Sequence, residues 1–307
     1  MNLSIVTTVY KSRPFLEEFI EGCIQAIQGI GENDFEIIFV LDGITDSSKE
    51  FLLEKKKHIP NIVVVELSRN FGHHHAISAG LQTANGEKIF LIDCDLEVSP
   101  TILIQFYRKM LDTGADVTYG YQEKRKGKFM ERFLGGLFWK TFNWLSDIHV
   151  PENVITERLM TRKYLNALNT LSDKNLFLGG MMYWVGFYQV GIPVNKKQRH
   201  GKSTYSFSKR LNLLIEAITS FSEKPLKLLL KFGLYLTVVA FLYALYLIIA
   251  KLANPETVII GYTSIMALLL FSTGFIITSI GAIGIYISKI FKQVQGRPLY
   301  IINNIYK

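Results

Sequence analysis

Two aspartates one residue apart are the first candidates for chemistry in this sequence. Asp93 and Asp95 flank Cys94 and come directly after an apolar run at residues 88–92. Two carboxylates at the end of a strand can hold a hard divalent cation, Mg²⁺ or Mn²⁺, which would bridge to the phosphates of a substrate. An Asp-x-Asp pair also occurs by chance in many loops, so the pair alone is weak support for a metal site.

The elements that must position these residues follow from the apolar pattern. Five runs share an apolar, β-branched composition that predicts strands, at residues 3–9, 35–41, 61–67, 88–92 and 117–120. Helical spacing separates them, at residues 14–27, 46–57, 74–83 and 100–113. Strands that alternate with helices predict an α/β fold with a mostly parallel sheet covered on both faces.

Polar residues gather after the predicted strands. Asp42 follows the second strand, Arg69 the third, and Asp93 and Asp95 the fourth. Ligands bind parallel sheets beyond the carboxyl ends of their strands. The sequence therefore predicts one shared site at this edge. The consecutive histidines at 73–75 point in different directions at a helix start, which favours helix-start and site-lining roles over metal ligation.

Composition narrows the classes of partner. Hydrophobic residues make up 49% of the 307 residues, and the formal net charge is +8. The basic residues cluster beside apolar spans and in one central stretch, so membrane and phosphate are better expectations than nucleic acid, for which no recognition motif is present. The two cysteines have neither zinc nor disulfide spacing and are expected to be reduced.

Two long segments lack any charge, at residues 232–250 and 258–288. Each exceeds or approaches the roughly 20 apolar residues that cross a hydrocarbon core, and neither has the polar face of a soluble helix, which argues against a pair of buried core helices. Lysine and arginine flank the pair on its outer sides and are scarce between the spans. The positive-inside rule then predicts a multi-pass membrane protein with both termini and the α/β domain in the cytoplasm.

The predicted boundaries divide the chain into four parts. Residues 1–205 form the α/β domain, 206–231 a juxtamembrane amphipathic segment, 232–288 the two spans, and 289–307 a cytoplasmic C-terminal tail. The amphipathic segment fits an interfacial membrane helix and a core-facing helix equally well.

Several segments together resemble a known family. Residues 68–81 and 92–97, with the later segments at 199–205, 221–226 and 296–300, are similar to the family 2 glycosyltransferases of the GT-A fold. More narrowly, they resemble the polyprenyl-phosphate glycosyltransferases, which include dolichol-phosphate mannose synthases and bacterial undecaprenyl-phosphate sugar transferases. The resemblance covers almost the whole chain and implies the bacterial cytoplasmic membrane as its location.

The resemblance implies roles for particular residues. It places the nucleotide of the sugar donor against Thr7, Val9, Tyr10, Asp42, Arg69, Asp93, Cys94 and Asp95. It implies metal binding by Asp93 and Asp95, which with Arg158 would be catalytic. It implies donor or acceptor phosphate binding by Arg125, Arg158, Arg199 and Lys202. Arg125 also lies in a charged stretch, 124–128, that fits a solvated loop equally well.

Departures from the family pattern bear on the sugar and the acceptor. The pattern's first Asp before Asp42 is Leu41 here, and its proline near the start is Thr8. An acidic position is lost at Thr156, and Glu157 stands beside it. Adjacent side chains of an extended segment point in opposite directions, so we expect Glu157 to be structural and to pair with a basic side chain.

The expected reaction is inverting transfer of a sugar, from a donor that we expect to be UDP-linked, to polyprenyl phosphate. A lipid phosphate is already anionic and needs no general base. One alternative is transfer to a sugar hydroxyl of a lipid-linked glycan, for which Glu157 would be the base. Another is an inactive nucleotide-sugar-binding membrane scaffold, against which the retained aspartates argue. The sequence leaves open whether the chain forms a homo-oligomer.

Overall fold

The computed structural model describes most of the chain. The described residues are 1–43, 46–123, 140–141, 143–146, 150–151, 153–171, 173–174, 178–196, 218–219, 222–253 and 261–307. Three predicted functional positions fall outside these limits. Arg125, Arg199 and Lys202 lie outside the described residues, and Lys196 is the last described residue before the gap at 197–217.

One mixed sheet organises the domain. Its strands are β1 (Leu3–Val9), β2 (Phe35–Leu41), β3 (Ile62–Leu67), β4 (Lys88–Leu91), β5 (Val117–Tyr121), β6 (Val154–Thr161), β7 (Gln189–Pro193) and β8 (Ile302–Tyr306). They are arranged in the order β7-β5-β6-β4-β1-β2-β3-β8. The central pairs β4–β1, β1–β2 and β2–β3 are parallel, as predicted.

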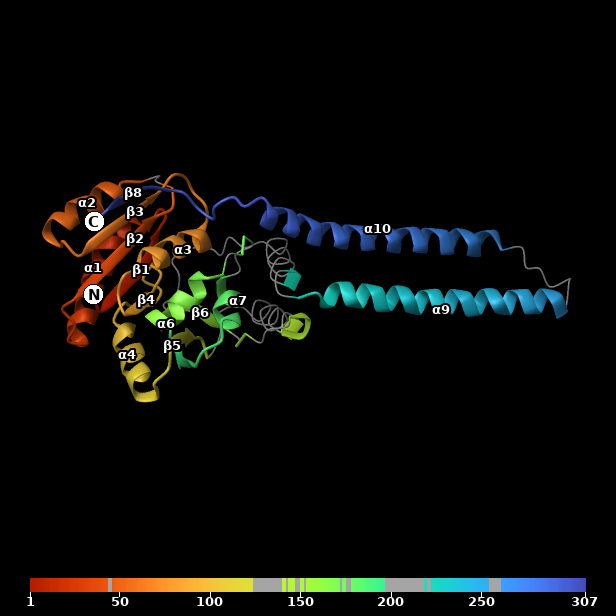
Figure 1. Ribbon diagram of the computed structural model, residues 1–307, viewed down its shortest axis with the longest axis horizontal. Coiled ribbons are helices and arrows are strands. Elements are labelled where there is room, and N and C mark those ends of the chain that lie inside the picture. The colour runs from red at the N-terminus through yellow and green to blue at the C-terminus, as the bar shows by residue number, and fades with distance from the viewer. Residues whose placement is uncertain are drawn as a thin grey trace.

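The helices cover the two faces of this sheet (Figure 1). They are α1 (Leu16–Gly29), α2 (Ser48–His58), α3 (His73–Thr83), α4 (Ile102–Thr113), α6 (Arg162–Asn169) and α7 (Leu178–Trp184). Alternate residues of β2 explain why both faces are apolar: Phe39 packs in a core with α1 and α4, and Val40 packs in a second core with α3. This arrangement confirms the predicted, mostly parallel sheet with covered faces.

The predicted boundaries differ little from the observed ones. The predicted helix at 14–27 is split, because a 3-10 turn at Arg13–Phe15 contains Pro14 and α1 begins only at Leu16. Helix α2 begins two residues later than predicted, at Ser48, and α3 begins one residue earlier, at His73.

Three strands were not predicted, and two of them run antiparallel to the central sheet. Strand β6 lies between β4 and β5, antiparallel to both, and β8 runs antiparallel to β3. Strand β7 extends the sheet beyond β5. The segment predicted as a C-terminal tail, 289–307, is therefore not separate from the α/β domain, because its residues Ile302–Tyr306 form the edge strand β8 of the same sheet.

Two long helices extend from the domain side by side (Figure 1). Helix α9 (Lys224–Ala253) begins before the predicted span at 232–250, and α10 (Tyr262–Val294) continues beyond the predicted span at 258–288. Phe232 packs edge-on against Phe275, with ring centroids 5.3 Å apart. Within the described residues, Lys224–Tyr243 and Phe271–Val294 are long and apolar enough to cross a membrane.

Candidate active site

The carboxyl ends of the central strands meet at one edge of the sheet, as predicted. Because β1 lies between β4 and β2, this edge brings together Tyr10 after β1, Asp42 after β2 and Asp93 after β4. Arg69 follows β3 at the same edge. Residues far apart in the sequence thus surround one region, which is where open α/β sheets bind ligands.

An acidic cluster lies at the end of β4. The Lys196 Nζ lies 3.4 Å from Glu97 Oε2 and 3.7 Å from Glu157 Oε1. Glu157 comes from β6 and is fully buried. The prediction that Glu157 pairs with a basic side chain is therefore confirmed, and its burial argues against a role as a base toward substrate.

Burial and mutual repulsion shift the acidities of this cluster. Desolvation raises the pKa of Asp93 to about 6, although Lys196 lowers it. Desolvation also raises the pKa of Glu157 to about 7, again against the effect of Lys196. Among the described residues, the carboxylates of Asp93, Asp95, Glu97 and Glu157 outnumber the ammonium of Lys196, so this cluster gains from additional positive charge.

His73 connects this cluster to β1. Its Nε2 lies 3.5 Å from Asp93 Oδ1, and its Nδ1 lies 3.0 Å from Thr8 Oγ1. Desolvation lowers the pKa of His73 below its ordinary value of 6.5, so the ring is mainly neutral at pH 7. A neutral ring that accepts from the Thr8 hydroxyl can donate from Nε2 toward Asp93. The predicted helix-start and site-lining role of His73 agrees with this placement.

Asp42 is bound to the loop that follows β3. It is buried, and its carboxylate oxygens accept hydrogen bonds from the backbone amides of Phe71 at 2.7 Å and Gly72 at 3.0 Å. Its carbonyl oxygen accepts from Asn70 Nδ2 at 3.0 Å. Asp42 therefore holds the loop that leads into α3, and both oxygens that were expected to bind base or ribose are engaged within the protein.

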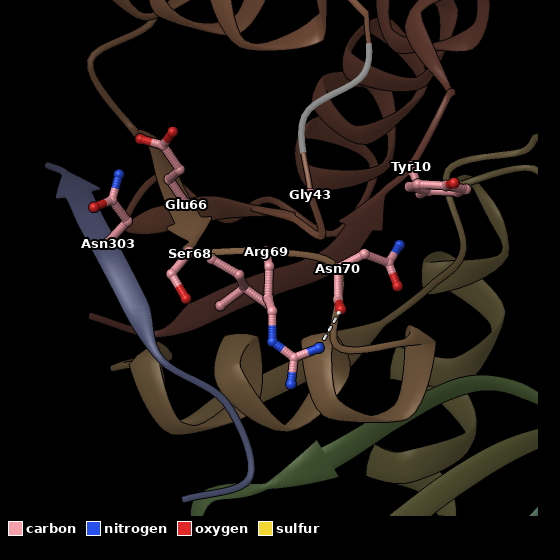
Figure 2. A pocket seen from close by; sticks show the side chains of 8 residues that line it. Tyr10, Gly43, Glu66, Ser68, Arg69, Asn70 and Asn303 are labelled. Carbon is pink, nitrogen blue, oxygen red and sulfur yellow. Dashed lines mark hydrogen bonds between the residues drawn. The ribbon is translucent and has the colours of Figure 1, made fainter.

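A cavity of about 450 Å³ opens beside this loop. Tyr10 and Gly43 contribute from the ends of β1 and β2, residues 66–70 from the end of β3, and Asn303 from β8. Figure 2 shows Arg69 and Asn70 between Tyr10 at one end and Asn303 at the other. Its volume is within the range of about 300–1,000 Å³ usual for small-molecule sites.

Three residues predicted to contact the nucleotide are buried and do not line this cavity. Thr7 and Val9 are buried within β1 and do not line the cavity, because that part of the strand is covered on both faces. The Cys94 thiol is buried and donates to the carbonyl of Thr8 at 3.0 Å. Desolvation raises the pKa of Cys94 to about 11, so the thiol stays protonated. Tyr10 and Arg69, which were also expected to contact the nucleotide, do line the cavity.

Arg158 is also separated from the acidic cluster. Alternation along β6 directs it away from Glu157, and it is 2% exposed. Its Nε donates to the carbonyl of Thr156 at 3.2 Å, and its Nη2 to that of Ile155 at 3.3 Å. Tyr164 and Tyr183 lie near its charge. A catalytic or phosphate-binding role for Arg158 would require this buried side to open.

The acidic cluster by itself does not form a closed metal site. Among the described residues, no three His, Cys, Asp or Glu side chains converge closely enough to hold an ion. Mg²⁺, however, is commonly held by one or two carboxylates and completed by substrate phosphates and water. The donor set at Asp93 and Asp95 fits that kind of site.

Sequence reasoning missed two residues that the structure brings to this edge. Lys196 is one of several basic residues in its segment, and nothing in the sequence distinguishes it from its neighbours. Asn303 lies near the end of the chain, and no local pattern connects it with the polar residues after β1 to β3. Only the pairing of distant strands reveals both.

Comparison with known proteins places this arrangement in a family. The sequence model described as "Glycosyl transferase family 2" matches residues 4–171, more than half of the chain. The chain belongs to glycosyltransferase family 2. The matched residues include β1 from its second residue, the whole of β2 to β6 and both aspartates of the Asp-x-Asp pair.

Relatives of this family 2 chain match it from end to end. It is 38% identical over 306 residues to a glycosyltransferase of Mycobacterium tuberculosis (strain CDC 1551 / Oshkosh), covering 100% of this chain and 89% of the relative. It is 32% identical over 307 residues to the SfII prophage-derived bactoprenol glucosyl transferase of Shigella flexneri, covering 98% and 97%. A solved mannosyltransferase of Pyrobaculum calidifontis, in complex with GDP-Man and Mn2+, matches with 15% identity and a TM-score of 0.49 over 97% of this chain and 88% of that chain.

The predicted family and fold class are thereby confirmed. The chain is a family 2 sugar transferase with a mixed, mostly parallel GT-A-type sheet, followed by two apolar helices.

Proposed function

We propose that this enzyme transfers a sugar from a nucleotide sugar, UDP-linked in our expectation, to polyprenyl phosphate at the cytoplasmic face of a bacterial membrane. The observation that carries the proposal is end-to-end similarity to a bactoprenol glucosyl transferase, including the two apolar helices. The acidic cluster and the cavity at one sheet edge support it, because a sugar donor needs both a nucleoside site and a diphosphate site.

The donor would occupy both parts of this edge. The cavity would take the nucleoside, with Tyr10 and Arg69 against it, and the diphosphate would lie toward Asp93 and Asp95. A divalent cation held by those two carboxylates would supply charge stabilisation to the departing diphosphate. His73 would orient Asp93 through its Nε2, and Lys196 would offset part of the negative charge of the cluster.

The reaction needs no protein base. A phosphate oxygen of the acceptor forms the bond to the anomeric carbon, while the bond from that carbon to the diphosphate oxygen breaks. The electron pair of the broken bond leaves with the nucleoside diphosphate, and one such displacement inverts the anomeric configuration. Bringing two anions together requires cations, for which Arg125, Arg199 and Lys202 are the proposed residues.

The course of the chain supports a membrane hairpin. Helices α9 and α10 lead away from the sheet and back, and β8 then pairs with β3. A chain that crosses a membrane twice returns to its starting side, as this pairing requires. The basic residues that flank the hairpin favour the cytoplasm for that side.

A donor-by-acceptor screen tests the proposal. The purified full-length enzyme would be reconstituted in lipid with UDP-, GDP- and dTDP-linked hexoses, and lipid products would be identified by mass. We expect a hexosyl-phosphoryl-polyprenol product, lost in Asp95→Asn and kept in Asp112→Asn, an exposed aspartate on α4. Transfer only to a lipid-linked glycan, or donor binding without transfer to any acceptor, would overturn the proposed reaction.

A further inference from the structure

The last strand of the chain forms part of the cavity wall. Strand β8 follows α10 directly and pairs with β3 through Tyr306 opposite Val64 and Asn304 opposite Glu66. The amide of Ser68 also donates to the carbonyl of Ile301 at 2.9 Å. The cavity is therefore completed by residues that follow both apolar helices in the sequence.

A β-bulge in this pairing leaves Asn303 unpaired with β3. Asn304 pairs with Glu66, but the next residue of β3, Leu67, pairs with Ile302. Asn303 is thus the extra residue of the bulge and has no partner on β3. Bulges redirect a side chain and are common beside active sites. Figure 2 shows Asn303 on β8 beside Glu66, at the end of the cavity opposite Tyr10.

Glu66 on β3 binds two residues of β8 that follow Asn303. Glu66 is buried and accepts from Lys49 Nζ at 2.9 Å, from Asn304 Nδ2 at 3.3 Å and from the Tyr306 hydroxyl at 3.2 Å. Burial raises the pKa of Glu66, but the hydrogen bonds from Lys49 and Asn304 outweigh it and the net shift is downward. The ionised Glu66 therefore fixes β8 against β3 at two positions, Asn304 and Tyr306.

Asn303 differs from Glu66 and Asn70 in the cavity in having an uncommitted polar group. Glu66 is engaged by β8 and Lys49, and the Asn70 side chain donates to the carbonyl of Asp42. Within the residues that the structure describes, the Asn303 carboxamide makes no hydrogen bond. It can offer one donor and one acceptor side by side.

We propose that Asn303 recognises the nucleobase of the sugar donor and so helps to determine which nucleotide is accepted. This inference rests on the proposed function, in which the cavity takes the nucleoside. A carboxamide complements a base edge that carries an adjacent N–H and carbonyl, such as that of uracil. Two parts of one donor site, the ends of β1 to β3 and strand β8, would then be separated in the sequence by the membrane hairpin.

Nucleotide binding to the intact protein tests this role. Full-length wild type, Asn303→Ala and Lys307→Ala would be titrated calorimetrically in detergent with UDP, GDP, CDP and inorganic pyrophosphate, each with Mg²⁺. Lys307 is the exposed residue that follows β8, so its replacement controls for changes at the end of the chain. Thermal unfolding of each variant would verify that the fold is kept.

We expect Asn303→Ala to weaken the preferred nucleotide roughly two- to tenfold, as for loss of one hydrogen bond, and to reduce the preference among bases. Pyrophosphate binding should not change, and Lys307→Ala should match wild type. Equal nucleotide affinities for Asn303→Ala and wild type, or an equal loss in Lys307→Ala, would overturn the assignment. Wild type that binds pyrophosphate but no nucleotide would instead refute the proposed donor.

Discussion

His73 Nε2 lies 3.5 Å from Asp93 Oδ1, at the point where the first turn of α3 meets the end of β4. The other ring nitrogen lies 3.0 Å from Thr8 Oγ1, so the imidazole joins two strand ends. Thr8 stands where the resemblance leads one to expect proline, which has no hydroxyl. This chain thus positions its first site aspartate through a contact that the family pattern does not specify.

Replacements of His73 should separate its two contacts. A glutamine amide reproduces the position of Nε2 and an asparagine amide that of Nδ1. Loss of a residue that orients a metal-binding carboxylate commonly costs about 10- to 100-fold in metal affinity or activity. We expect a loss of that size for His73→Asn and a smaller one for His73→Gln, in initial transfer rates measured across a Mn²⁺ titration. Equal rates in both variants and wild type would remove His73 from the site.

Lys196 should contribute to stability through its buried carboxylate partners. Its replacement by Met leaves Glu157 without its cation, and breaking a buried pair costs about 3–5 kcal/mol. We expect Lys196→Met to lower the free energy of unfolding by about 3 kcal/mol, and Glu157→Gln in the same chain to restore much of it. Denaturant unfolding in detergent measures both.

Lys57→Met is the matched control for Lys196→Met. Lys57 pairs with Glu54 on the surface of α2, where both side chains are more than half exposed. Such pairs contribute about 0–1 kcal/mol. A loss in Lys57→Met as large as in Lys196→Met would show that removing any lysine has this effect.

The stability of the metal-free protein should decrease as pH rises. Desolvation raises the pKa of Glu157 from 4.5 to about 7. Between these values the folded protein keeps a proton that the unfolded chain has lost, so the free energy of unfolding falls with rising pH. In EDTA, Glu157→Gln should reduce this decrease and be more stable than wild type at pH 8, by on the order of 2–3 kcal/mol. Parallel melting-temperature profiles at pH 4–9 would contradict the buried-acid assignment.

Cysteine labelling should reveal the orientation of the hairpin. We expect an impermeant thiol reagent to label Ala253→Cys, at the end of α9, from outside intact cells, and not Lys307→Cys. The native cysteines give little background because Cys23 and Cys94 are buried, and desolvation raises the pKa of both thiols. The reverse labelling pattern would place the catalytic edge outside the cell. Lysed cells, in which both positions should react, provide the control.

The sequence alone determined the parts that depend on local pattern. The runs at β1 to β4 are apolar on both faces, so they predict buried parallel strands without reference to the rest of the chain. The same strand ends place Asp93, Asp95 and Arg69 at one edge. Two segments without charge predict the long helices, because no polar face remains to be solvated.

Only the tertiary structure decided which distant residues meet at that edge. Strands β6 and β8 join the sheet by pairings between segments far apart in the chain. Neither has a clear alternation of apolar and polar residues from which a strand could be predicted. Alternation predicted that Glu157 points away from the side of Thr156, but only packing shows that Glu157 meets Lys196 and that Arg158 is buried. Only the fold shows that both carboxylate oxygens of Asp42 accept hydrogen bonds from backbone amides. Asn303 reaches the cavity through a bulge, and register is set by side-chain packing and hydrogen bonding between strands rather than by either strand alone.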